Sequence, residues 1–164
     1  MNSFQLENII KSTPRLRNIA EVLPWNYLPK TKPKTRRIYI VNTLHSERST
    51  SNQLGHWFLL LSASGTGDNI QFCSFSQDYD DILPGYFKDN LTVNIFQLQS
   101  FNTVVCGQFC VYIAWHLAAK KNRRTYDSIL GDFTVNNTLS NDLKVFNFVK
   151  DKFGVVTDLF LEIK

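Results

Sequence analysis

The segment LQSFNTVVCGQFC, residues 98–110, places two thiols four residues apart at the start of a strongly apolar stretch. A cysteine at a helix N-terminus can act as a nucleophile, because the unsatisfied N–H groups there favour its thiolate. Cys106 holds that position, and Gly107 beside it allows close approach of a substrate carbonyl, with the Cys106 N–H as an oxyanion donor. Cys110 lies one turn deeper. We therefore take Cys106 as the candidate nucleophile and Cys110 as a packing residue.

A thiol nucleophile needs a base, and the chain has three histidines. His116 would lie about 15 Å from Cys106 along one helix and cannot reach the thiol. His45 lies in a polar loop, whereas His56 opens an apolar strand from which it can be presented to a cleft. Cys73, inside an expected strand, is interpreted as a small apolar residue. From the residues alone two interpretations stay open: Cys106 and His56 react together, or they are a structural thiol and a hairpin-capping histidine.

The hydrophobic pattern predicts the elements that would position these groups. Strands are expected over four apolar or β-branched runs: 36–43, 55–63, 70–75 and 91–99. Helices are expected over four further segments: 4–10, 106–119, 125–133 and 139–153. The segment 106–119 is apolar on every side and should be buried, while 24–36 reads as an irregular connection broken by prolines. The prediction is an α+β fold, with a central buried helix packed on a small mixed β-sheet and flanking helices.

The chain has 164 residues, of which 43% are hydrophobic and 20% charged, as in an ordinary globular domain. This length predicts a single domain over 1–164. The longest apolar runs fall well short of the roughly 20 residues needed to cross a bilayer. No secretory signal follows Met1. We therefore expect no membrane helix and a location in the cytosol or nucleus.

The net charge of +4 is concentrated in two basic runs, KTKPKTRR at 30–37 and KKNRR at 120–124. Two interpretations are open. Such runs are commonly solvated loops. They can also form a binding surface for nucleic acid or another polyanion.

Three motifs in a fixed order carry a resemblance to a known family. They are GHW at 55–57, the glutamine Gln99 seven residues before the CG pair of Cys106, and the second FC cysteine in the following helix. In this order they resemble the adenovirus maturation protease (adenain) and its relatives from Polinton/Maverick elements, adintoviruses and virophages. The segment NNTLSNDLKVFNFV, 136–149, looks more like the Polinton-type proteases. The resemblance covers most of the chain and implies a cysteine-protease-like fold of the adenain and SUMO-protease type.

The resemblance implies a catalytic role for each matching residue. Cys106 would attack a peptide carbonyl, and His56 would take the thiol proton and pass it to the leaving amine. Gln99 would donate an amide N–H to the oxyanion. These roles agree with the position of Cys106 at a helix N-terminus.

The third member of the family's triad is missing. The family carries Asp or Glu in an F-D-S-x-G or F-E-P-x-G context, where this chain reads QFCSFSQ at 71–77, and we place Ser74 at that position. A serine hydroxyl could orient the imidazole but supplies no charge. Three explanations stay open: a Cys–His pair with Ser74 as a neutral orienter, a displaced carboxylate such as Asp78, or lost catalysis. We rank them in that order, because a thiolate–imidazolium pair depends less on a third group.

By this resemblance we expect a cysteine endopeptidase of a virus or virus-like transposon. It would cleave capsid and core precursor proteins during virion maturation, favouring small residues around the cleaved bond. We expect a monomer without metal or organic cofactor, in the host nucleus or cytoplasm and packaged in the virion. DNA and a short viral peptide stimulate the adenovirus relative, so both are candidate partners. No cysteine precedes Gln99 in its strand to tether such a peptide.

Two other functions are compatible with the same residues. Proteases that remove SUMO or ubiquitin-like tags share the fold and the order of His, Gln and Cys. A catalytically weakened protease fold could instead serve as a binding module that docks nucleic acid through 30–37 and 120–124. The unusual residue at the acid position is the main support for this second alternative.

Overall fold

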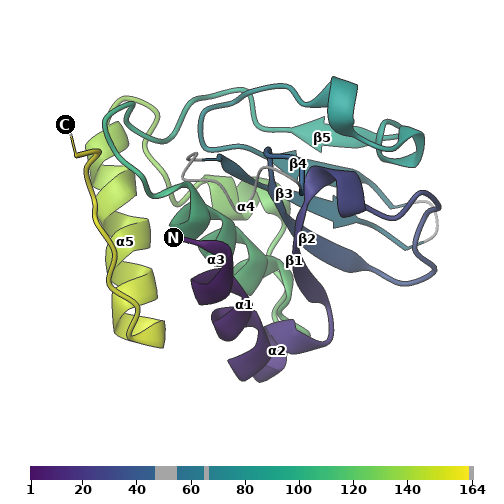
Figure 1. Ribbon diagram of the computed structural model, residues 1–164, viewed down its shortest axis with the longest axis horizontal. Helices are drawn as coiled ribbons and strands as arrows, with labels where there is room; N and C mark the ends of the chain where they lie inside the picture. The colour runs from purple at the N-terminus through teal and green to yellow at the C-terminus, as the bar shows by residue number, and fades with distance from the viewer. Residues whose placement is uncertain (47–54, 65–66, 163–164) are drawn as a thin grey trace.

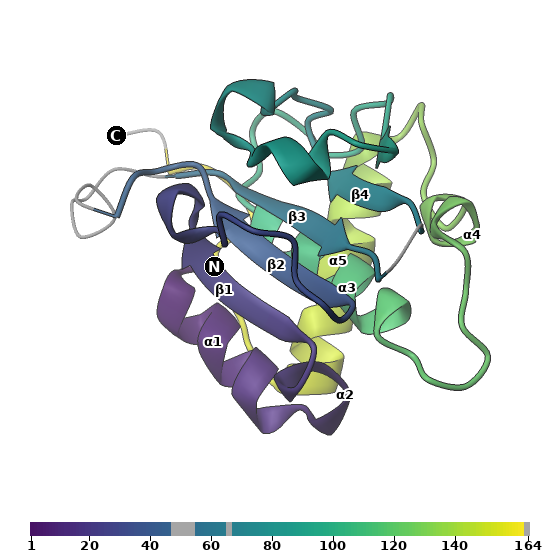
Figure 2. The ribbon, with the colours of Figure 1, turned by 90° about the vertical axis from the view of Figure 1, so that its right-hand side faces the viewer.

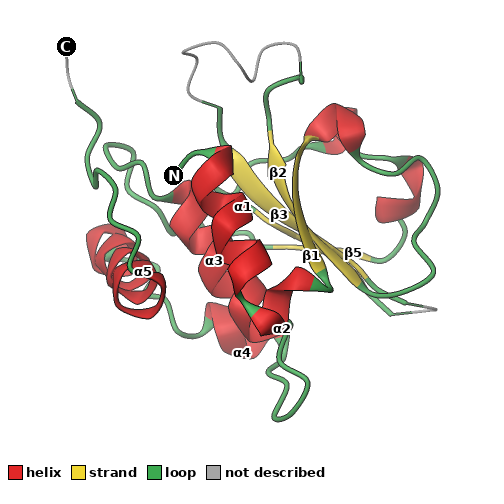
Figure 3. Ribbon diagram, turned by 60° about the horizontal axis from the view of Figure 1, so that its bottom comes forward, coloured by secondary structure: helices red, strands yellow, loops and turns green. Residues whose placement is uncertain are grey.

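The computed structural model describes residues 1–46, 55–64 and 67–162. A five-stranded sheet lies between a layer of helices and a layer of loops and short 3-10 turns (Figure 1, Figure 3). The strands follow one another in chain order: β1 Ala20–Pro24, β2 Arg37–Asn42, β3 Trp57–Ser62, β4 Asn69–Phe72 and β5 Leu91–Val93. The two outer pairs are parallel and the two inner pairs antiparallel. The predicted α+β fold with a small mixed sheet is confirmed.

The α-helices of the described residues lie on the same side of the sheet (Figure 3). They are α1 Ser3–Ser12, α2 Pro14–Arg17, α3 Cys106–Leu117, α4 Tyr126–Leu130 and α5 Thr138–Phe153. The central helix α3 is buried along most of its length and packs against β3 and α5. This agrees with its apolar composition, because a helix without a polar face has to be surrounded by protein. Figure 2 shows α1 and α2 at the β1 edge of the sheet, with α4 beyond β4.

The loop layer on the opposite face contains three short 3-10 turns. These are η1 Trp25–Tyr27, η2 Asp80–Ile82 and η3 Gly85–Phe87. Each face of the sheet has its own apolar core, since successive strand residues point to opposite sides. Trp57 and Leu59 of β3 belong to the core shared with α3, whereas Phe58 packs with Cys73 and Phe87 under the loops. A residue's place along a strand therefore decides which layer it meets.

Three strands differ from the prediction, and the first of them, β4, ends at Phe72 rather than at residue 75. β1 was not expected, because AEVLP is short and contains a charged residue and a proline, yet it pairs in parallel with β2. β5 ends at Val93 rather than at Gln99. The reason lies in Asn94, whose side-chain amide takes the place of a backbone partner. Its Oδ1 accepts the Cys73 N–H at 2.9 Å, and its Nδ2 donates to the Cys73 carbonyl at 2.6 Å.

Parts of two expected loops lie outside the described residues. They are 47–54, in the loop that follows His45, and 65–66, in the turn of the hairpin expected at 65–69. Among the helices of the described residues, none is both long and apolar enough to span a membrane.

Candidate active site

Cys106 is the first residue of α3 and is partly exposed, whereas Cys110 is fully buried. No side chain caps this helix at Val105, so the first N–H groups of α3 keep their hydrogen-bonding capacity. The nearby backbone N–H groups of Trp57 and Gly107 favour the charged form of the Cys106 thiol. Burial raises the pKa of the Cys106 thiol, and these two donors oppose that rise. The expected thiolate at the helix N-terminus is therefore corrected to a neutral thiol in the resting protein.

His56 is held by its backbone at the start of β3. Its N–H donates to Thr43 Oγ1 and its carbonyl accepts the Thr43 N–H, both at 3.0 Å. The imidazole lies beside the rings of Phe75 and Tyr79, with centroids at 5.1 and 6.5 Å. Burial in these surroundings lowers the pKa of His56 to about 4. The base is thus neutral at pH 7, and the expected thiolate–imidazolium pair is not the favoured resting state.

The residue that contacts the imidazole is Cys73, at 3.3 Å from His56 Nε2 to Sγ. Ser74 instead donates its hydroxyl proton to Gln99 Oε1 at 2.6 Å. The expectation that Ser74 orients the ring is therefore corrected. A shift of one residue moves a strand side chain to the opposite face, so Cys73 joins His56 on the loop side. The motif contained this signal, because the family's acid directly follows the phenylalanine, and here Cys73 directly follows Phe72.

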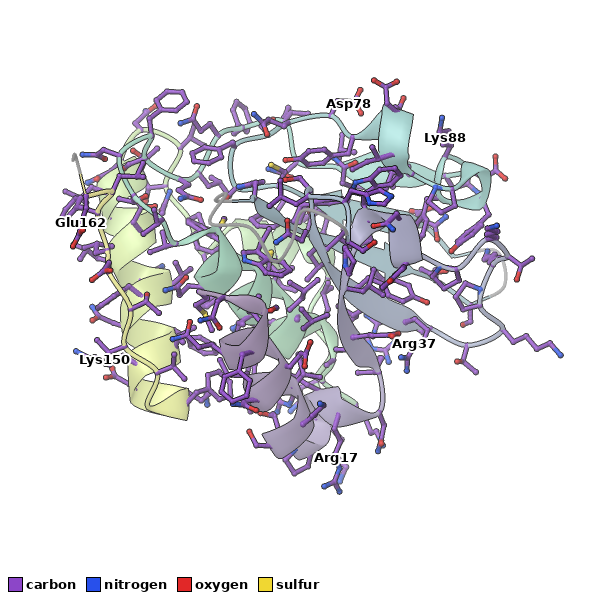
Figure 4. All side chains as sticks on the ribbon, viewed as in Figure 1. Arg17, Arg37, Asp78, Lys88, Lys150 and Glu162 are labelled. Carbon is purple, nitrogen blue, oxygen red and sulfur yellow. The ribbon has the colours of Figure 1, made fainter. Side chains whose placement is uncertain are left out.

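Asp78, the alternative carboxylate, is directed elsewhere. Its side chain is exposed, and its Oδ1 accepts the N–H of Asp80 at 2.9 Å. Figure 4 labels Asp78 at the outer surface, beside η2. Among the described residues, no carboxylate contributes to the pKa of His56, whose shift has burial as its cause.

Gln99 is only 1% exposed and its side-chain amide is fixed at both ends. Oε1 accepts from Ser74, and Nε2 donates to the Thr103 carbonyl at 3.0 Å. A carboxamide nitrogen carries two protons, so the bond to Thr103 leaves one N–H for a second acceptor. Gln99 therefore has the donor that an oxyanion requires, in the segment that leads into Cys106.

Helix α5 supports this segment with two adjacent buried residues. The Asp142 carboxylate accepts the Ser100 N–H at 3.2 Å and the Thr103 hydroxyl at 3.1 Å. Asn141 Nδ2 donates to the Leu98 carbonyl at 3.1 Å. Burial raises the pKa of Asp142, and the donors from Ser100 and Thr103 counteract the rise. The sequence predicted a helix over 139–153 and a family-like motif at 136–149, but not that this helix anchors the loop that carries Gln99.

A closed circuit of contacts joins these residues. His56 touches Cys73, and Ser74, the next residue, bonds to Gln99. Gln99 bonds to Thr103, three residues before Cys106, and Gly107, next to Cys106, lies against the ring of Trp57, the residue after His56. The structure thus brings His56 against Cys73, which had been interpreted as packing, and ties the Gln99 amide to the segment that leads into Cys106.

The approach to Gly107 is occupied. A Cβ added there would lie 3.0 Å from the Met1 Cβ and 3.6 Å from the Trp57 ring. The Trp57 indole N–H also donates to the Met1 carbonyl at 2.9 Å. The expected free access beside Gly107 is therefore corrected: the first residue lies next to the first turn of α3 (Figure 1).

One arginine of each basic run lies within electrostatic range of the other. Burial, together with the nearby charge of Arg123, lowers the pKa of Arg36 to about 10. Arg124 is neutralised by Asp132, with an Nη1 to Oδ2 distance of 2.6 Å. Some of the cations therefore stabilise the fold, and Arg36 and Arg123 bring like charge from both runs together.

No protein-family model matches this sequence, and no curated protein shows significant similarity to it. The chemistry of the site has to be inferred from its own geometry. The site contains a thiol at a helix N-terminus, a fixed carboxamide, and a neutral imidazole on the residue before Trp57, whose backbone lies beside that thiol. Together these groups suit nucleophilic acyl transfer.

Proposed function

We propose that this chain is a cysteine endopeptidase with Cys106 as nucleophile, His56 as base and Gln99 as oxyanion donor. One observation carries the proposal: the residue after Cys106 lies against the residue after His56, since a Cβ added at Gly107 would be 3.6 Å from the Trp57 ring, so the start of α3 is held beside the strand that begins next to His56. The bond between Gln99 and Thr103 supports it, since it ties the amide to the segment before Cys106.

The proposed mechanism starts from a neutral pair. Cys106 Sγ attacks the peptide carbonyl while His56 removes the thiol proton, so a full thiolate need not form beforehand. The oxyanion that develops accepts N–H groups from the start of α3 and from Gln99 Nε2. The imidazolium returns its proton to the departing amine, which leaves a thioester on Cys106. Water, deprotonated by His56, then hydrolyses the thioester and restores the thiol.

The order of GHW, Gln99 and CG supports a viral or transposon-encoded enzyme. On this proposal its substrates are capsid and core precursor proteins, cleaved beside small residues during virion maturation. The place of action would be the host nucleus or cytoplasm and then the virion. The occupied space beside Gly107 favours substrates with little bulk at the reacting bond.

The test compares wild-type protein with Cys106→Ala on a peptide library rich in glycine and alanine, with cleavage sites read by mass spectrometry. We expect cleavage by wild type only, with Cys110→Ala as the matched control that retains activity because its thiol is buried. Iodoacetamide at neutral pH should modify Cys106 faster than Cys110 or Cys73. Identical peptide sets from wild type and Cys106→Ala would refute the proposal.

Removal of SUMO or ubiquitin-like tags is the alternative substrate class, since those proteases share the order of His, Gln and Cys. Activity-based probes made from the SUMO and ubiquitin C-termini distinguish it. An adduct on Cys106 with either probe, in the absence of peptide-library cleavage, would replace the endopeptidase proposal by this one.

Docking of nucleic acid is a further property that one observation favours, namely the approach of Arg36 to Arg123. Among the described residues, the Arg36 Nη1 atom is buried without a hydrogen-bond partner. Fluorescence anisotropy with a labelled DNA duplex should show weaker binding for the Arg36→Ala and Arg123→Ala double variant than for Lys150→Ala on α5. Equal DNA binding by the double variant and by Lys150→Ala would show that the basic runs are solvated loops and no binding surface.

A further inference from the structure

Four polar groups form a row that leads away from His56 on the loop side of the sheet. His56 Nε2 lies 3.3 Å from Cys73 Sγ, and Cys73 Sγ lies 3.5 Å from the Tyr79 hydroxyl. The Tyr79 hydroxyl donates to Gln77 Oε1 at 2.9 Å. The row therefore ends on an amide oxygen, which can only accept a hydrogen bond.

This terminal acceptor determines the direction of every bond in the row. Tyr79 has one proton and gives it to Gln77, so towards Cys73 its oxygen can only accept. The single Cys73 proton then points to Tyr79, and the Cys73 sulfur has to accept from His56. The imidazole consequently carries its proton on Nε2, and Nδ1 keeps its lone pair.

We propose that Gln77, Tyr79 and Cys73 form a directed, uncharged hydrogen-bond chain that fixes the tautomer of neutral His56 and leaves Nδ1 as the proton acceptor. Cys73 and Tyr79 are positioning residues, because they act through the imidazole. The inference rests on the proposed function in one point: the proton that Nδ1 accepts is the thiol proton of Cys106.

Cys73, Tyr79 and the Gln77 backbone are each anchored, while the Gln77 side chain is exposed. Asn94 clamps both backbone groups of Cys73. Tyr79 stacks on Phe58, with ring centroids 4.1 Å apart. The Gln77 carbonyl accepts from Gln71 Nε2 at 3.0 Å. Burial, and next the neighbouring Cys73, raise the pKa of Tyr79 far above its ordinary range, so its hydroxyl remains a donor.

A chain of neutral groups and a carboxylate have different effects on an imidazole. A carboxylate both orients an imidazole and stabilises its cation. The chain from Gln77 orients the ring without charge, which matters here because His56 is already neutral at pH 7. For a neutral imidazole, the choice of protonated nitrogen decides whether it can act as a base.

The first experiment is nitrogen-15 NMR of the imidazoles at pH 7, which reads the tautomer whether or not the protein cleaves peptides. We expect the Nε2–H tautomer for His56 in wild type. Tyr79→Phe removes the acceptor of the Cys73 proton and should produce a tautomer mixture. Tyr27→Phe, on an exposed ring, is the matched control and should leave His56 unchanged. The Nδ1–H form in wild type, or no change in folded Tyr79→Phe, would overturn the chain.

The second experiment varies Cys73 itself. Cys73→Ser keeps a donor and an acceptor and should retain the Nε2–H tautomer, whereas Cys73→Ala should lose it. Cys73→Asp adds the missing charge, so the pKa of His56 should rise and alkylation of Cys106 at pH 7 should accelerate at least tenfold. Equal tautomer ratios in the Ser and Ala variants would overturn the proposal. If the variants show the expected tautomers but the protein cleaves no peptide, the proposed function is refuted and the hydrogen-bond chain is still supported.

Discussion

Cys73 and Ser74 are neighbours in sequence, yet they serve two unlike environments. On the Cys73 side, the imidazole of His56 meets sulfur and aromatic rings, and its hydrogen-bond partner lies at 3.3 Å. On the Ser74 side, the amide of Gln99 meets oxygen at 2.6 Å, within a network that ends at the buried carboxylate of Asp142. The two residues that follow β4 thus contact different site residues, Cys73 the imidazole of His56 and Ser74 the amide of Gln99.

The difference shows that one part of the site holds a side chain firmly by hydrogen bonds, while the other part sets the pKa of a histidine by burial. Hydrogen bonds to charged groups are roughly twice as strong as neutral ones, so the amide side is held firmly. Sulfur is a weak donor and a weak acceptor, so burial dominates the properties of His56 on the other side. We therefore expect variants on the amide side to change rate and stability most, and variants on the imidazole side to change pH dependence.

Gln99→Ala should have the largest effect among the predictions that follow. It removes the oxyanion donor and raises the barrier by roughly 3 to 4 kcal/mol, a fall in kcat of about 10² to 10³. Gln99→Glu keeps the acceptor for Ser74 but has no N–H to donate, so it should be equally slow. Steady-state kinetics on a peptide cleaved by wild type provide the measurement. Wild-type activity in Gln99→Glu would contradict the assigned role.

Asp142→Ala tests the charged anchor of the amide side. The Ser100 N–H loses its acceptor and the Thr103 hydroxyl keeps only the Ser100 carbonyl at 3.0 Å, which should lower the free energy of unfolding by about 2 to 3 kcal/mol. The measurement is urea unfolding followed by tryptophan fluorescence. Asp151→Ala, exposed on the same helix, is the control and should shift stability by less than about 0.5 kcal/mol. Equal effects at the two positions would remove the distinction between the two sides.

His56→Gln tests the imidazole side through pH. The folded pKa of about 4 lies below the unfolded value, so the unfolded chain binds the proton first as pH falls. Stability from neutral His56 is complete above pH 6.5 and decreases towards pH 4. Between pH 7 and pH 5, wild type should lose about 2 kcal/mol more than His56→Gln. Burial also lowers the pKa of His116, but that residue is common to both proteins and cancels. Parallel pH curves would refute the burial of His56.

Asp78→Asn should have the smallest effect. Its carboxylate is exposed and accepts only a local N–H from Asp80, so stability should change by less than about 0.5 kcal/mol. The pH profile of peptide cleavage should match that of wild type, since the Asp78 carboxylate is not among the causes of the His56 pKa shift. A shifted acidic limb would show that this carboxylate acts on His56 and would weaken the contrast between the two sides.

Sequence patterns predicted the parts of the fold that depend on local composition. The buried helix α3 is apolar all round, and β2 and β3 are dense in β-branched or large apolar residues, so their positions were recognised within two residues. β1 and the early end of β5 depend on pairing with distant segments. The Asn94 side chain that replaces a ladder partner cannot be recognised from its own neighbourhood.

The candidate site was predictable to a similar degree. Cys106, His56 and Gln99 follow from position and motif order. The partner of His56 was misplaced by one residue, because strand alternation had not been applied through Phe72 to Cys73. The pKa directions of Cys106 and His56 also could not be read from the chain, since burial by distant segments determines both.

The position of Met1 has a practical consequence for producing the protein. Its side chain rests over Gly107, and its carbonyl accepts from the Trp57 indole. Any affinity tag joined before Met1 would emerge beside the thiol and could shield it from substrates and from alkylating reagents. A tag with a cleavable linker, assayed before and after its removal, would separate an inactive enzyme from a merely obstructed one.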